Sequence, residues 1–183
     1  MTARPARDTY RHGNLREAAL AAARAMVETG GHEALSLRKV AQAAGVAHRS
    51  LYGQFEGREA LLDAVAQAGF EDLAVPLAAA ASRADFVEAY VRFALANPRL
   101  YDLMRSRPHA TMKFRPSLQK AVHLGITQAM RLFADPAASK EANRRAVMKV
   151  LILLHGGIAM HRSGILDLPG DEGLIAELQA MMG

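Results

Sequence analysis

The stretch SLRKVAQAAGVAHRSLYGQFEGREALL, residues 36–62, constrains the fold more than any other part of this chain. Its first segment has apolar residues at the i, i+3, i+4 and i+7 positions of a helix, namely Leu37, Val40, Ala41 and Ala44. Ser36 suits the N-cap of that helix, and Gly45 can end it in the left-handed conformation at little cost. The pattern predicts a short helix, a tight turn and a second helix.

The second predicted helix has one apolar side and several polar ones. Leu51 and Phe55 lie one helical turn apart and are expected to face the core. The other faces carry His48, Arg49, Ser50, Tyr52 and Gln54. Such side chains can bond base edges and phosphate oxygens in the major groove of DNA. Any one of them also suits a solvated surface, but the ordered set of cap, small residue, turn glycine and aromatic-ended helix favours a DNA-reading module.

The stretch resembles the tetracycline-repressor (TetR) family of bacterial transcription regulators. The resemblance runs from about Tyr10 to Phe70 and is carried by YRHGNLREAAL, LSLRKVAQAAGV, SLYGQF and GREALL. It implies an all-α fold, in which an amino-terminal three-helix helix-turn-helix domain precedes a helical ligand-binding and dimerisation domain. We place the DNA-binding domain at residues 1–72, with a basic arm at 1–11, and the second domain at 73–183.

The resemblance also implies residue roles in the first domain. The residues that match base-reading positions are Arg38, His48, Arg49 and Ser50. The residues that match phosphate-contacting positions are Tyr52, Gln54 and Arg58. The chain departs from the family pattern at Ala47, where a Ser or Thr cap is common, and at Gly53, where a bulky residue is usual. A glycine within a helix costs about 0.5 to 1 kcal/mol relative to alanine, so we expect a loose reading helix.

Composition limits the remaining possibilities. The chain has 183 residues, 51% of them hydrophobic, and no cysteine, so it can form a real core without disulfides or thiolate sites. It has neither an 18-residue apolar run nor a signal-peptide pattern, and we expect it in the cytoplasm. The net charge of +5 suits a polyanionic partner, although an arginine-rich composition explains it equally.

Periodicity predicts helices along the whole chain. The first is stopped at Gly30, and the helix that begins at Glu59 meets Pro76 and an alanine-rich connection. Beyond it we expect helices at 84–96, through Tyr101 and Met104, and at 116–133, 138–162 and 171–182, with a loop at 106–114. This half also resembles the TetR carboxy-terminal domain type with a Trp-His-Gly signature. The resemblance is carried by FVEAYVRFALANPRLYDLM and LILLHGG, but Leu151 stands in place of the tryptophan.

Effector contacts are inferred from helix faces in the second half. The candidates are Phe86, Tyr90, Phe93, Met104, Met112, Phe114, Leu118 and His155, which are equally suited to a plain core. Residues 92–131 carry eight basic residues against one acidic residue, which suits either an anionic effector such as an acyl-CoA or carboxylate, or a solvated face.

Apolar stripes near the carboxy terminus predict a homodimer through a four-helix contact. Its candidate interface residues are Val147, Leu151, Leu154, Ile158, Leu174 and Leu178. Two-fold symmetry then requires an inverted-repeat operator. The expected function is a DNA-binding regulator, a repressor that a small-molecule effector releases. An effector-independent architectural dimer is the alternative. No reactive motif, cofactor or metal site is expected, and the chain is not expected to be an enzyme.

Overall fold

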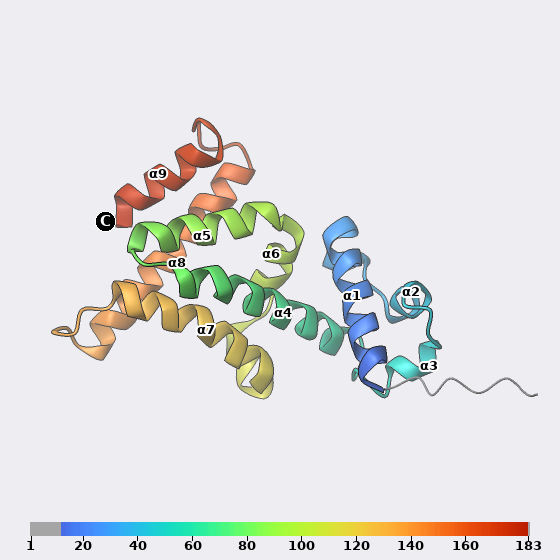
Figure 1. The fold of residues 1–183 in the computed structure, drawn as a ribbon. Coiled ribbons are helices and arrows are strands. Elements are labelled where there is room, and N and C mark those ends of the chain that lie inside the picture. The colour runs from blue at the N-terminus through green and yellow to red at the C-terminus, as the bar shows by residue number, and fades with distance from the viewer. Residues whose placement is uncertain (1–11, 183) are drawn as a thin grey trace, which may run out of the picture. The chain divides into compact units, whose positions relative to one another are not determined.

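The computed structural model describes residues 12–182, and every regular element in this range is helical (Figure 1). The predicted all-α fold is therefore confirmed. In chain order the elements are α1 His12–Gly30, the 3₁₀ turn η1 His32–Ala34, α2 Leu37–Ala43, α3 His48–Leu51, α4 Arg58–Ala79, α5 Arg83–Ala96, α6 Pro98–Arg105, the 3₁₀ segment η2 His109–Phe114, α7 Pro116–Phe133, α8 Lys140–Arg162 and α9 Gly170–Met182. The basic arm predicted at 1–11 lies outside the described residues.

The chain forms two compact units, the first ending at Val65 and the second beginning at Ala66. This division falls inside α4, which therefore contributes residues to both units. The domain boundary expected after residue 72 also lies inside this helix and stays a prediction. Each unit is described below by itself.

The first unit shows why residues 36–54 form a helix-turn-helix. Ser36 Oγ accepts the Lys39 backbone N–H at 3.3 Å, which caps α2 as expected. At the other end, Gly45 has a φ of 67°. Its N–H donates to the Gln42 carbonyl and the Val46 N–H donates to the Ala41 carbonyl, a pairing that satisfies the last carbonyls of α2. The turn is thus closed by local backbone bonds.

Helix α3 is much shorter than the sequence suggested. It ends at Leu51, and residues 52–54 form turns, so Gly53 follows the helix and does not lie within it. Ala47 caps α3 without a side-chain hydrogen bond. The missing side-chain cap at Ala47 and the glycine at position 53 both disfavour a longer helix. Leu51 and Phe55 are nevertheless buried, as expected, at 0% and 3% exposure.

Helix α4 continues past the proline that was expected to end it. Pro76 lies inside the helix, and the break comes at residues 80–82. Proline removes one hydrogen bond and usually kinks or ends a helix. Buried Leu73 and Leu77, on either side of Pro76, hold α4 against the rest of the unit, and this packing favours continuation.

In the second unit, α5, α8 and α9 pack against one another, and α7 packs against α8 and α5 (Figure 1). Ser82 and Asp85 form a capping box that starts α5. Ion pairs connect the helices at their edges: Arg92 of α5 contacts Glu172 of α9 at 2.9 Å, and Arg162 of α8 makes two bonds to Asp102 of α6, at 2.7 and 2.8 Å. The second domain therefore has its own core.

The turn geometry predicts different effects for two neighbouring glycines. Gly45→Ala should lower the free energy of unfolding by about 1 to 2 kcal/mol, because alanine must adopt the positive φ. Gly53→Ala is the matched control: its φ is not positive, and an added Cβ would lie 3.6 Å from the nearest atom, Ser50 O. It should change stability little or raise it by about 0.5 kcal/mol. Urea unfolding compares the two, and equal losses would contradict the role given to Gly45.

Candidate nucleic-acid interface and effector cavity

The helix-turn-helix presents a cationic surface. Residues 36–55 contain Arg38, Lys39 and Arg49 and no acidic residue. Arg38, His48 and Arg49 are exposed, as is Tyr52 at 57%. Within the described part of the chain, neither Arg38 nor Arg49 has a hydrogen-bond or ion-pair partner. The His48 and Tyr52 rings meet edge to face at 5.2 Å. These groups are available to a polyanion.

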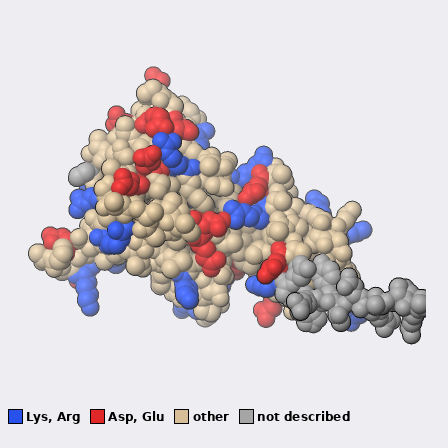
Figure 2. Space-filling model, viewed as in Figure 1, with Lys and Arg blue, Asp and Glu red and all other residues tan. Residues whose placement is uncertain are grey.

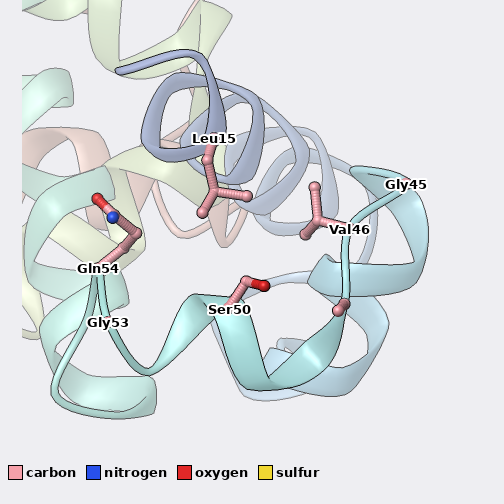
Figure 3. Close-up of a pocket in the computed structure, with 7 residues that line it drawn as sticks. Leu15, Gly45, Val46, Ser50, Gly53 and Gln54 are labelled. Atoms are coloured by element: carbon pink, nitrogen blue, oxygen red, sulfur yellow. The ribbon is translucent and has the colours of Figure 1, made fainter. Parts of the chain in front are cut away.

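Ser50 and Gln54 lie beside a hollow of about 550 Å³ between α1 and the helix-turn-helix. Figure 3 shows the Ser50 side chain pointing toward the space between Leu15 and Val46. Gln54 is half-buried. Ser50 is exposed, as Arg49 is, and the assignment of Ser50 to a base and of Gln54 to a phosphate stays a prediction.

Arg16 of α1 fixes the segment after α3. Its Nη1 donates to the Gln54 carbonyl at 2.9 Å, and its guanidinium carbon lies 4.6 Å from the centre of the Phe55 ring. The backbone at Gln54 and the buried Phe55 ring are thereby both held against α1. Sequence reasoning missed Arg16, because its partners are 38 residues away or more.

Arg58 is engaged inside the first unit. Its Nε donates to the Leu35 carbonyl at 2.9 Å and its Nη2 to the His32 carbonyl at 2.7 Å, while Nη1 contacts Glu59 at 2.7 Å. These bonds attach the start of α4 to η1. The phosphate contact expected from the resemblance stays a prediction, and it would have to compete with these bonds or extend them.

The second unit contains a cavity of about 780 Å³, within the usual range of ligand sites. Of the eight effector candidates, four line it: Phe86, Tyr90, Met104 and His155. The other four are not among its lining residues. Met112 and Leu118 are buried elsewhere, Phe93 is half-buried, and Phe114 is 76% exposed at the end of η2. Helical spacing alone did not separate these two groups.

A hydrogen-bonded cluster forms part of the cavity wall. Tyr101 Oη and His155 Nδ1 are 2.5 Å apart, with the donor depending on the imidazole tautomer, and the Tyr90 ring lies 6.2 Å from the Tyr101 ring. Burial raises the pKa of Tyr101 to about 12. Burial, together with the Tyr101 side chain, raises the pKa of Tyr90 well above 10.0. Both phenols are therefore neutral at physiological pH.

Four cations line the cavity, and none of them was among the eight effector candidates: Arg105, Arg107, Lys140 and Arg144. Arg107 is the one charged residue buried among those described, with 9% exposure. Its guanidinium donates to Ser106 Oγ at 3.2 Å. Two of these cations fall in the basic run at 92–131. The signal for the other two was their spacing, since positions 140, 144, 147, 151 and 155 share one face of a helix.

The predicted dimer residues lie mostly inside the subunit. Val147, Leu154, Ile158, Leu174 and Leu178 are all at most 4% exposed, and Leu151 lines the cavity. The buried faces of α8 and α9 pack against each other and α5, so these side chains contact their own chain. The large apolar residues of α8 that remain exposed are Met148, Ile152 and Met160.

Two further expectations concern metals and membranes. Among the described residues no group of three or more His, Cys, Asp or Glu side chains could hold a metal ion. His161 instead contacts Asp171 at 2.9 Å. None of the described helices is both long and apolar enough to span a bilayer. On the face in Figure 2, basic and acidic side chains are interspersed.

Comparisons with known proteins agree with this geometry. The family model described as bacterial regulatory proteins, tetR family, matches residues 19–65. The model described as Tetracyclin repressor-like, C-terminal domain, matches residues 84–182, more than half of the chain. The Trp-His-Gly type of carboxy-terminal domain stays a prediction. No curated protein matches the chain.

Solved structures share the whole architecture. A protein of unknown function from Rhodococcus sp. RHA1 has a TM-score of 0.76 at 28% identity, with 96% of this chain and 97% of that chain covered. A TetR transcriptional regulator from Legionella pneumophila has a TM-score of 0.60 at 17% identity, with 98% and 97% covered. The second likeness concerns the fold alone.

The buried phenol of Tyr101 predicts a pH effect on stability. In the unfolded chain it loses its proton near 10.0, but in the folded chain only near 12, so wild-type stability falls between these values. Tyr101→Phe has no such group and lacks the bond to His155. The excess in free energy of unfolding of the wild type over this variant should therefore shrink as the pH rises. Urea unfolding of both proteins at about pH 8 and about pH 11 measures the difference, and a constant difference would contradict a neutral buried phenol.

Proposed function

Since this chain belongs to the TetR family of bacterial regulatory proteins, we propose that it is a repressor that binds an inverted-repeat operator as a homodimer and is released by a small-molecule effector. As a member of this family it is a DNA-binding transcriptional regulator and not an enzyme. The observation that carries the repressor proposal is the pairing of an exposed cationic helix-turn-helix with a ligand-sized cavity in the second unit.

In this proposal Arg38, His48, Arg49 and Ser50 contact base edges, and Tyr52, Gln54 and Arg58 contact phosphates. The exposure of Arg38 and Arg49 supports their role, because a guanidinium can bond a guanine through two donors. Two-fold symmetry would place the two reading helices about one duplex turn apart, about 34 to 36 Å or somewhat more.

The proposed dimer contact uses the exposed face of α8. Ile152, at 63% exposure, and Met160, at 40%, lie two turns apart, with Gly156 one turn from each. A Cβ added to Gly156 would meet nothing within 4 Å. A glycine between exposed apolar side chains lets a second helix approach closely, and this supports a helix-packing interface between two copies of the chain.

The proposed switch couples the cavity to α4. Met104 lines the cavity, and its Sδ lies only 2.8 Å from the position of a Cβ added to Gly69 of α4. Gly69 thus permits a close contact between α6 and α4. Helix α4 begins at Arg58, shortly after the proposed DNA-reading residues 48–54. A coupling of about 1 to 3 kcal/mol would change DNA affinity about 5- to 150-fold. Nearly complete release would need about 5.5 kcal/mol.

The alternative is an architectural DNA-binding dimer without an effector. A closed, fully packed second domain would support it. The cavity of about 780 Å³ instead supports an effector site.

Selection of bound fragments from the native genome tests the function. We expect enrichment of an inverted repeat that the protein retards in a gel at low salt. Thermal-shift screening of metabolites, followed by the same gel assay, tests release. Fragments without any shared palindrome would contradict the proposal.

Two substitutions separate reading from positioning. Arg49→Ala should cost about 1 to 3 kcal/mol on the operator and relax its specificity, because a base contact is lost. Tyr52→Phe should weaken binding to all DNA sequences alike, because a phosphate contact does not distinguish between bases. Equilibrium binding to operator and random duplexes compares them. If Arg49→Ala lost equal affinity for both duplexes, the two roles would be wrongly assigned.

The dimer face has its own test. Ile152→Glu should shift the protein toward monomers, because a carboxylate buried in an apolar contact is costly. Val75→Glu is the control, since Val75 is similarly exposed, at 71%, on α4. Analytical ultracentrifugation at micromolar concentration measures both. A wild-type protein that sediments only as monomers would exclude the dimer, and equal dissociation of the two variants would exclude this face.

A further inference from the structure

The cavity of the second unit has an unbalanced charge. Its lining includes the cations Arg105, Arg107, Lys140 and Arg144, and no acidic residue is among the described residues that line it. A wall of low polarity strengthens the field of such cations relative to water. A ligand with a negative charge would therefore be favoured over a neutral ligand of the same shape, and a cationic ligand would be disfavoured.

The apolar part of the lining is elongated along α8. From Arg144 to His155 this helix rises about 16 Å, at roughly 1.5 Å per residue. Val147 and Leu151 lie between them on the same side and also line the cavity. Met148 and Ile152, which are exposed, also line the cavity. A chain-like apolar body fits this wall better than a compact polar molecule does.

Three polar groups of the lining, from Arg105, Tyr101 and His155, lie close together in one part of the cavity. The Arg105 guanidinium carbon lies 5.7 Å from the centre of the Tyr101 ring, and Tyr101 is hydrogen-bonded to His155. The buried guanidinium of Arg107 also lines the cavity. The raised pKa values of Tyr90 and Tyr101 keep both phenols uncharged, so they do not repel an anion. Arg105 is exposed, so a head group bound there keeps part of its hydration.

We propose that the effector is an amphipathic carboxylate, whose head group binds at Arg105 beside Tyr101 and His155 and whose apolar chain lies along Val147 and Leu151. This inference rests on the proposed effector-released regulator and names the chemical class of its ligand. Charge-assisted hydrogen bonds to the guanidinium provide the selectivity for the head group, and the apolar wall provides the affinity for the chain.

Three amphipathic probes of similar length test the class. Decanoate, decan-1-ol and decyltrimethylammonium carry unbranched apolar chains of about nine or ten carbons and differ mainly in their head groups. Isothermal calorimetry with the full chain should give decanoate an affinity at least about tenfold above that of decan-1-ol, and no measurable binding of the cation. Equal affinities for the three probes, or a preference for the alcohol or the cation, would overturn the proposal.

Variants test the site. Arg105→Gln should remove the preference for decanoate over decan-1-ol, and Arg105→Lys should keep much of it, because the charge remains. Arg145→Gln is the control: it removes an equal charge next to Arg144 but does not line the cavity. Thermal unfolding establishes that each variant folds. If folded Arg105→Gln kept the preference for decanoate, or if Arg145→Gln lost it equally, the placement of the head group at Arg105 would be wrong.

Gel retardation of the selected operator separates the two proposals. If the protein binds the operator and the decanoate series shows no anion preference, the ligand class is wrong and the regulator proposal stands. If it binds no DNA fragment, the regulator proposal fails whatever calorimetry shows for decanoate.

Discussion

Helix α4 belongs to both compact units, and the proposed switch depends on this continuity. The helix runs from Arg58 to Ala79, whereas the units divide after Val65. Each part is anchored within its own unit: Arg58 binds the carbonyl oxygens of η1 and Leu35, and Gly69 admits the close approach of Met104. No loop that could absorb a displacement separates these anchors. In the proposed switch, a shift of α6 at the cavity would act on α4 at Gly69.

The parts of the fold that the sequence predicted correctly are those that depend on near neighbours. Ser36 caps α2 through the amide of Lys39, and Gly45 closes the turn with carbonyls of the preceding helix. Both interactions span five residues or fewer, so the local pattern contains all of their determinants. The same holds for the boundaries of α7, where Pro116 at the first turn fixes the start.

Other features depend on partners far along the chain, and the sequence could not specify them. The apolar stripe through Val147, Leu154 and Ile158 could be buried equally well by helices of the same chain or by a second copy. In the structure α5 and α9 pack against it. Likewise, Phe86 lines the cavity but Phe93, two turns later on α5, does not. Helical periodicity identifies an apolar face, but only tertiary packing decides what that face contacts.

The cationic lining also has a consequence for the free protein. Like charges around a cavity repel, and burying the Arg107 guanidinium costs free energy that its interactions must offset. A core selected for stability alone would favour apolar residues at such positions. An anion in the cavity would offset this repulsion and would stabilise the state that binds it by RT ln(1 + [L]/Kd). The feature that weakens the empty domain is thus the one that would make its conformation responsive to a ligand of opposite charge.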